Sequence, residues 1–138
     1  MIKIEYTDPE IIEALVRELP EFEYKNTKNE ILDRCSNKDG KYICCKENNM
    51  YAGFLVAYAI NQNTYYNWIM GVLPEYREKG CASLMLNFFE KYARSQGYRN
   101  CMVKTMNKYR NMLILLIKNG YEIVDVENNS MIILKKNI

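Results

Sequence analysis

The sequence contains no histidine among its 138 residues. This absence excludes Ser-His and Cys-His catalysis, and it excludes every metal site that needs an imidazole ligand. Its five cysteines are an odd number and show no CxxC spacing, which favours free thiols in a reducing compartment and no metal site. Any chemistry that this chain performs must therefore use other groups.

Long apolar runs are also missing. The longest is "MLILLI", residues 112–117, whereas a membrane-spanning helix needs about 20 apolar residues. The opening "MIKIEYTDPE" lacks the apolar core of a signal peptide, so a cytoplasmic protein with no membrane partner is expected.

Strong net charge is absent as well, because the formal charge is only +2. Residues 5–30 carry eight acids and three bases, and the rest of the chain is basic. Nucleic acid usually requires a stronger basic stripe, whereas a small phosphorylated ligand needs only a few cations and backbone N–H groups. The small ligand is favoured.

The apolar periodicity predicts one α/β domain over residues 1–138. Its mixed sheet is expected in the order β-α-α-β-β-β-α-β-α-β-β, with about seven strands and four helices. Strands are expected at 1–6, 41–47, 50–60, 64–72, 100–106, 121–127 and 130–136, and helices at 9–19, 28–36, 81–96 and 110–119. No repeat, linker or low-complexity segment divides the chain.

The third helix is expected to be amphipathic and to end at Gly97, a residue suited to a left-handed C-terminal cap. The side chains expected on its apolar face are Leu84, Met85, Phe88, Phe89 and Tyr92.

A basic, glycine-containing bend precedes this helix in "GVLPEYREKGCASLML", residues 71–86. The first N–H groups of a helix lack intrahelical partners, and the helix dipole is positive there. Gly80 allows the chain to turn, and the small side chain of Ala82 leaves room beside the backbone. Arg77 and Lys79 add positive charge, so the bend suits an anion such as pyrophosphate. A solvated loop with a glycine N-cap is the alternative.

On these residues the chain resembles the GNAT superfamily of N-acetyltransferases. The stretch "VLPEYREKGCASLML" is similar to the family's acyl-coenzyme A motif, V-x-P-x-x-R/Q-x-x-G-x-G/A before a leucine-rich helix. The stretch "IKNGYEIV" is similar to its helix, Gly-Phe/Tyr, strand signature. The likeness covers most of residues 41–136, and residues 1–40 match only in helix content.

The resemblance implies an acyltransferase that uses acetyl-CoA, with a GNAT-like fold. The coenzyme's pyrophosphate would bind the backbone N–H groups from Arg77 through Ala82, with Ser83 in the same turn. Its pantetheine arm would pair with the fourth strand, and the N–H of Val72 would stabilise the oxyanion. The expected cofactor-binding residues are Met70, Gly71, Val72, Arg77, Glu78, Lys79, Gly80, Cys81, Ala82, Ser83 and Asn107. A turn after a strand is the alternative for Asn107.

Catalytic side chains depart from the family pattern. Many relatives carry a tyrosine acid four residues before the Gly-Phe/Tyr pair, but Leu116 occupies that position here, and Tyr109 is the candidate substitute. The fourth strand contains no acid, so Glu21 or Glu23 would serve as the base, or the acidic N-terminal region would attract a cationic amine.

The function expected from the resemblance is direct acetyl transfer from acetyl-CoA to a primary amine in a ternary complex. The departures at the acid and base positions leave an alternative, a non-catalytic module that senses acyl-CoA or CoA. The acceptor would be a small-molecule or peptide amine, and a homodimer is the expected assembly if the chain oligomerises.

Overall fold

A computed structural model describes all residues, 1–138, as one seven-stranded sheet flanked by helices. The elements are β1 (Ile2–Tyr6), α1 (Pro9–Arg17), α2 (Lys28–Cys35), β2 (Lys41–Glu47), β3 (Met50–Ala59), β4 (Thr64–Val72), the short 3₁₀ helix η1 (Pro74–Tyr76), α3 (Cys81–Ser95), β5 (Asn100–Met106), α4 (Arg110–Lys118), β6 (Glu122–Glu127) and β7 (Met131–Asn137). This order confirms the predicted one. None of the helices combines the length and apolarity that crossing a bilayer requires.

Local sequence signals explain where most elements begin and end. Asp8 caps α1 by accepting a hydrogen bond from the N–H of Ile11 at 3.2 Å, with Pro9 in the first turn. Thr27 and Glu30 form a reciprocal capping box at the start of α2. Two hairpins turn on Asn pairs with positive φ, the conformation that tight hairpins require: Asn48 and Asn49, Asn128 and Asn129.

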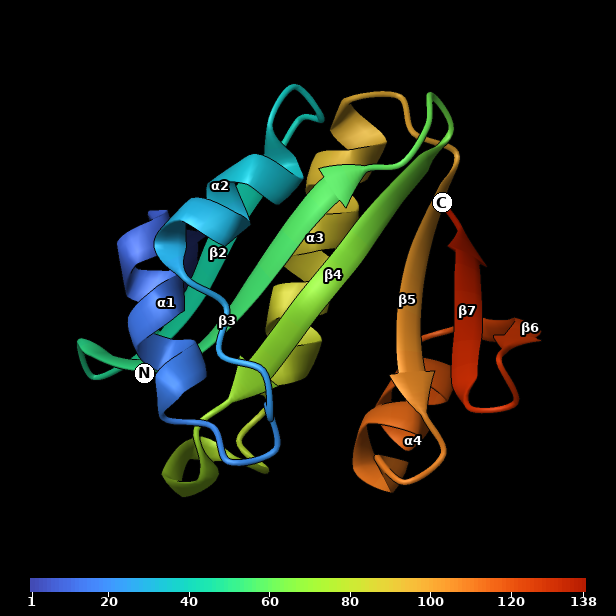
Figure 1. The fold of residues 1–138 in the computed structure, drawn as a ribbon. Helices are drawn as coiled ribbons and strands as arrows, with labels where there is room; N and C mark the ends of the chain where they lie inside the picture. Colours follow the sequence, from blue (N-terminus) through green and yellow to red (C-terminus); the bar gives the residue numbers. More distant parts are fainter.

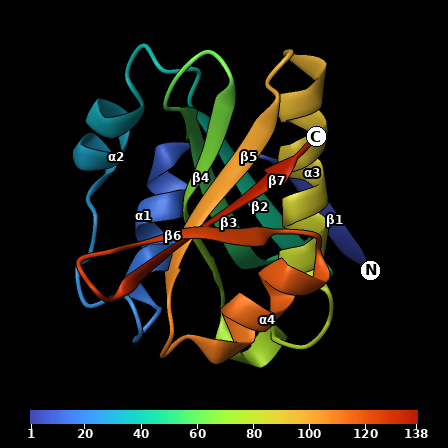
Figure 2. The same cartoon turned by 90° about the vertical axis from the view of Figure 1, so that its right-hand side faces the viewer.

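The strand order across the sheet is β1-β2-β3-β4-β5-β7-β6. All neighbours run antiparallel except β4 and β5, which are parallel. Helices α1 and α2 cover one face, and α3 and α4 cover the other (Figures 1 and 2). The parallel pair divides the sheet into an N-terminal part and a C-terminal part.

Strands β4 and β5 are paired over only part of their length. Their register runs from Thr64 opposite Asn100 to Asn67 opposite Val103 and then stops. Trp68 is the next residue and forms a bulge against β3, because Val56 pairs with Ile69 and Ala57 pairs with Asn67. Beyond this point the two strands diverge (Figure 1). We call the unpaired ends, residues 68–72 of β4 and 104–106 of β5, the splay.

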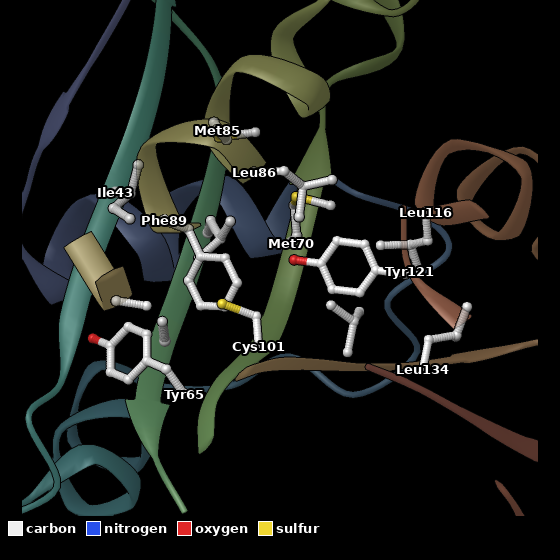
Figure 3. Packing of buried hydrophobic residues seen from close by; sticks show 14 of the residues in the cluster. Ile43, Tyr65, Met70, Met85, Leu86, Phe89, Cys101, Leu116, Tyr121 and Leu134 are labelled. Carbon is white, nitrogen blue, oxygen red and sulfur yellow. The ribbon is translucent and has the colours of Figure 1, made fainter. Parts of the chain in front are cut away.

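The core on the α3 and α4 face joins both parts of the sheet. Figure 3 shows Leu86 of α3 beside Met70 of β4 and the ring of Tyr121, with Leu116 of α4 and Leu134 of β7 further along. These side chains belong to one cluster of 18 buried residues, and a second cluster of 13 lies against α1 and α2. The five cysteines are all buried and free, as predicted.

The buried face of α3 differs from the predicted one. Leu84 is 41% exposed, whereas Leu86 is fully buried. Phe88 and Tyr92 are only partly buried, and the fully buried set is Cys81, Met85, Leu86, Phe89, Glu90 and Ala93. The helix is therefore rotated relative to the expected stripe, because the sheet contacts the Met85 and Phe89 side of it.

Candidate functional site

The predicted anion-binding bend lies at the end of α3 that adjoins the splay. Gly80 is the N-cap and has φ of 90°, and Glu78 also has a positive φ, 64°. Left-handed residues in such a turn curl consecutive N–H groups toward one another, which is how backbone anion-binding concavities form. A Cβ added at Gly80 would meet no atom within 4 Å, so the space in front of the helix is open.

Six consecutive backbone N–H groups at this bend donate no hydrogen bond within the chain: those of Glu78, Lys79, Gly80, Cys81, Ala82 and Ser83. The N–H of Arg77 is different, because it already donates to the carbonyl oxygen of Pro74 at 3.3 Å. The row of unbonded amides therefore begins at Glu78, one residue later than the sequence predicted. Together with the helix dipole, these amides could hold an anion without a side chain.

The two bases at the bend are already paired with acids. Arg77 forms an ion pair with Glu21, and its Nε donates to the carbonyl oxygen of Val72 at 2.9 Å. The ammonium of Lys79 lies 3.3 Å from the carboxylate of Glu47. These contacts hold the bend against β4, β2 and the segment that follows α1, and they reduce the free positive charge that an anion would meet. Backbone amides are thus the main donors available here.

The peptide groups of β4 point alternately toward β3 and toward the splay. The N–H of Leu73 donates to the carbonyl oxygen of Ala52 at 2.8 Å, so Leu73 faces β3. Antiparallel alternation then turns the peptide groups of Met70 and Val72 away from β3 and into the splay. An extended ligand could pair with these two residues as an added strand, although the carbonyl oxygen of Val72 already accepts a hydrogen bond from Arg77.

Gly71 has a different role from the one expected of it. Its peptide groups face β3, opposite Phe54. A Cβ at this position would collide with Leu19 Cδ1 and lie 3.1 Å from Phe54 Cε1. Gly71 is therefore needed for close packing of α1's C-terminal extension against the sheet, and not for a contact inside the splay.

The far side of the splay carries Asn107 and Tyr109. Because β4 and β5 are parallel, Asn107, exposed in the turn after β5, lies at the same edge of the sheet as Val72. Tyr109 is the N-cap residue of α4, is partly exposed, and has a hydroxyl without a hydrogen-bond partner. Leu116, at the expected tyrosine position, is fully buried in the core.

The two candidate bases differ in their surroundings. Glu21 is committed to the ion pair with Arg77, whereas Glu23 is exposed and has no side-chain partner. Glu21 is linked to the splay through Arg77, whose Nε donates to the carbonyl oxygen of Val72, whereas no side-chain contact positions Glu23.

The hydroxyl of Tyr66 is a candidate proton donor that sequence reasoning did not identify as catalytic. Tyr66 lies on β4, immediately before Asn67, the last residue that pairs with β5, and its side chain faces α1 and α2. Its hydroxyl has no hydrogen-bond partner, and burial raises the pKa of Tyr66 to about 12. Like any tyrosine hydroxyl, the group is protonated at neutral pH, as a proton donor must be, and its raised pKa makes it a weaker acid. Aromatic residues are common in strands, so the sequence carried no signal for this role.

An open pocket of about 700 Å³ lies on the same face, beside the bulge of β4. It is lined by Tyr24, Asn26, Glu30, Asp33, Arg34 and Trp68. Trp68 directly follows Asn67, the last residue that β4 pairs with β5. The pocket is lined by α2 and its neighbours on one face, whereas the amide-bearing bend begins α3, which covers the other face.

Comparison with known proteins agrees with this geometry. Residues 9–121 match the model of the acetyltransferase (GNAT) family. No curated protein sequence matches the chain at a significant level.

Solved structures share the fold. A GNAT family acetyltransferase from Elizabethkingia anophelis with acetyl-CoA bound aligns with a TM-score of 0.75 and 20% identity, over 99% of this chain and 98% of that one. The PaiA N-acetyltransferase from Thermoplasma acidophilum, in complex with coenzyme A, gives 0.82 and 19% over 100% and 99%. The ribosomal-protein-S18-alanine N-acetyltransferase from Escherichia coli gives 0.84 and 11% over 100% and 94%. The family match covers most of the chain, and we conclude that this protein belongs to the GNAT acetyltransferase family.

Proposed function

We propose that the protein transfers the acetyl group of acetyl-CoA to a primary amine on a small molecule or peptide, by direct attack in a ternary complex. One observation carries the proposal: six unbonded amides, Glu78 to Ser83, follow closely in the chain on the outward-facing backbone of Met70 and Val72, where the carbonyl oxygen of Val72 already accepts from Arg77. The first set suits a pyrophosphate and the second suits an amide-containing arm. Two of the similar solved structures contain acetyl-CoA or coenzyme A, which supports this choice of ligand.

In the proposed reaction the lone pair of a neutral amine attacks the thioester carbonyl carbon. The carbonyl oxygen becomes an oxyanion, toward which the N–H of Val72 would donate. When the C–S bond breaks, the amine nitrogen has lost a proton and the sulfur gains one. Alignment of the two substrates can supply effective molarities of about 10⁵ M or more, so the chemistry does not require a histidine.

Two hydroxyls are candidates to protonate the leaving sulfur. Tyr109 lies at the far side of the splay, and Tyr66 lies at its apex on the face that carries the open pocket. Both lack hydrogen-bond partners in the chain, so either is free to donate. For the base, Glu23 is free, whereas Glu21 would first have to leave Arg77.

A second candidate function is supported by Leu116, which fills the usual tyrosine position with a buried apolar side chain. On this alternative the chain binds acyl-CoA or CoA and does not turn it over. The alternative and the main proposal share the binding site and differ only in chemistry.

The experiment that tests the proposal follows free thiol during incubation with acetyl-CoA and a panel of amines. Steady thiol release that depends on the amine would support acetyl transfer. Calorimetric binding of CoA without thiol release, across a panel of amino acids, polyamines, aminoglycosides and peptides, would favour the sensor. Failure to bind CoA would reject both.

A further inference from the structure

The pocket beside Trp68 contains a guanidinium that is held rigidly and has no acidic partner. The Nε of Arg34 donates to the hydroxyl of Tyr58 at 2.9 Å, and its Cζ lies 4.6 Å from the centre of the Trp68 ring. Stacking and this single hydrogen bond fix the plane of the guanidinium, while its two terminal nitrogens donate to nothing in the chain. In this state the planar guanidinium can bind a carboxylate through two parallel hydrogen bonds.

Arg34 lacks the counter-ion that three other bases near the splay have. Arg77 is paired with Glu21, Lys79 with Glu47 and Lys104 with Glu127, each within 4 Å. Arg34 forms no ion pair, although Glu30 and Asp33 line the same pocket.

The two carboxylates of the pocket are not equivalent. Both oxygens of Glu30 are occupied, one by the N–H of Thr27 at 3.0 Å and the other by the hydroxyl of Tyr24. The carboxylate of Asp33 has no partner. The pocket therefore offers one free guanidinium and one free carboxylate, whose combined charges favour entry of a zwitterion and disfavour a dianion.

We propose that the acceptor is a free amino acid, whose carboxylate binds Arg34 while its amine is directed toward the splay. This inference rests on the proposed function, because the pocket becomes an acceptor site only if the splay holds the acyl donor. The position of Trp68 connects the two: it stacks on Arg34 and follows the last paired residue of β4. Polyamines, aminoglycosides and protein N-termini lack a carboxylate next to the amine, so they would not use Arg34.

The chain has one tryptophan, so its fluorescence reports on this pocket directly. We would saturate the protein with CoA and titrate it with each protein amino acid and with the corresponding amino-acid amide, in which a neutral carboxamide replaces the carboxylate. At least one amino acid should change the Trp68 emission, and its amide should bind about tenfold more weakly or worse, because a charge-assisted bidentate contact is lost.

Arg34→Gln should remove the difference between acid and amide. Arg94→Gln is the matched control, because Arg94 also lies exposed in the last turn of a helix and forms no ion pair. The inference is overturned if no amino acid changes the emission, if amides bind as tightly as acids, or if Arg34→Gln preserves the difference.

Thiol release separates this inference from the proposed function. Amino-acid binding that requires Arg34, without thiol release, would retain Arg34 as a carboxylate site and would reject acetyl transfer and, with it, the role of the amino acid as acceptor. Thiol release only with carboxylate-free amines would support acetyl transfer and overturn the role of Arg34.

Discussion

Replacing Ala82 by glutamate should separate the stability of the fold from binding of the coenzyme. Ala82 is the second residue of α3 and carries one of the six unbonded amides. A carboxylate in the first turn interacts favourably with the helix dipole, by about 0.3 to 1 kcal/mol. The free energy of unfolding should therefore be unchanged or slightly higher in Ala82→Glu.

The same carboxylate would lie where a pyrophosphate is expected. Two unit charges about 4 Å apart repel by about 4 kcal/mol at an effective dielectric constant near 20. Rotation of the new side chain into solvent and screening by salt reduce this value, so we expect CoA to bind about a hundredfold more weakly at low salt, or about 2.7 kcal/mol.

Isothermal titration of CoA and urea unfolding of the same samples measure the two effects. Ala82→Gln has nearly the same size without the charge, so its difference from Ala82→Glu isolates electrostatic repulsion from steric blocking. Part of the affinity lost in Ala82→Glu should return at high salt. If Ala82→Glu binds CoA as tightly as the unaltered protein, the phosphates do not bind at this bend and the reasoning is refuted.

Three further predictions concern the core, alkaline pH and the proton donor. Lys136→Met should lower the free energy of unfolding by roughly 3 kcal/mol in urea titrations, because the buried carboxylate of Glu90 would keep only the hydroxyl of Tyr121 as a partner. Lys135→Met is the control. Equal effects of the two substitutions would contradict a stabilising role for the Lys136–Glu90 ion pair. Burial raises the pKa of Tyr42, Tyr66, Tyr98 and Cys101 to about 12. Above about pH 9 the folded state therefore keeps protons that the unfolded state loses, and the free energy of unfolding should fall by about 1.4 kcal/mol per pH unit for each such proton. Urea midpoints that do not fall with pH would contradict this. If acetyl transfer is confirmed, either Tyr66 or Tyr109 should protonate the sulfur. Replacing that tyrosine by phenylalanine should lower kcat about a hundredfold with little change in KM. If both variants keep the kcat of the unaltered protein, neither tyrosine is the donor.

Local signals were sufficient to predict most of the fold. The cap at Asp8 and the Asn pairs at the hairpins act over a few residues, so their effects can be read from sequence order alone. The left-handed glycines Gly97 and Gly120 after α3 and α4 belong to the same class.

The orientation of α3 was predicted less well for a physical reason. Its apolar residues form two overlapping stripes, one through Leu84 and Phe88 and the other through Met85 and Phe89. Helical periodicity cannot decide which stripe is buried when both are apolar. Contact with the sheet selected the second stripe.

The sequence by itself determined the element order, the free thiols and the position of the glycine-containing bend before α3, because each depends on neighbouring residues and on backbone chemistry. Only the tertiary structure decided where β4 and β5 separate, that Gly71 serves packing, and that Arg34 stacks on Trp68 across 34 positions of the chain. Those features depend on which strands end their hydrogen bonding together and which distant side chains then share a pocket. Such contacts are set by the packing of the whole sheet and leave no local pattern to read.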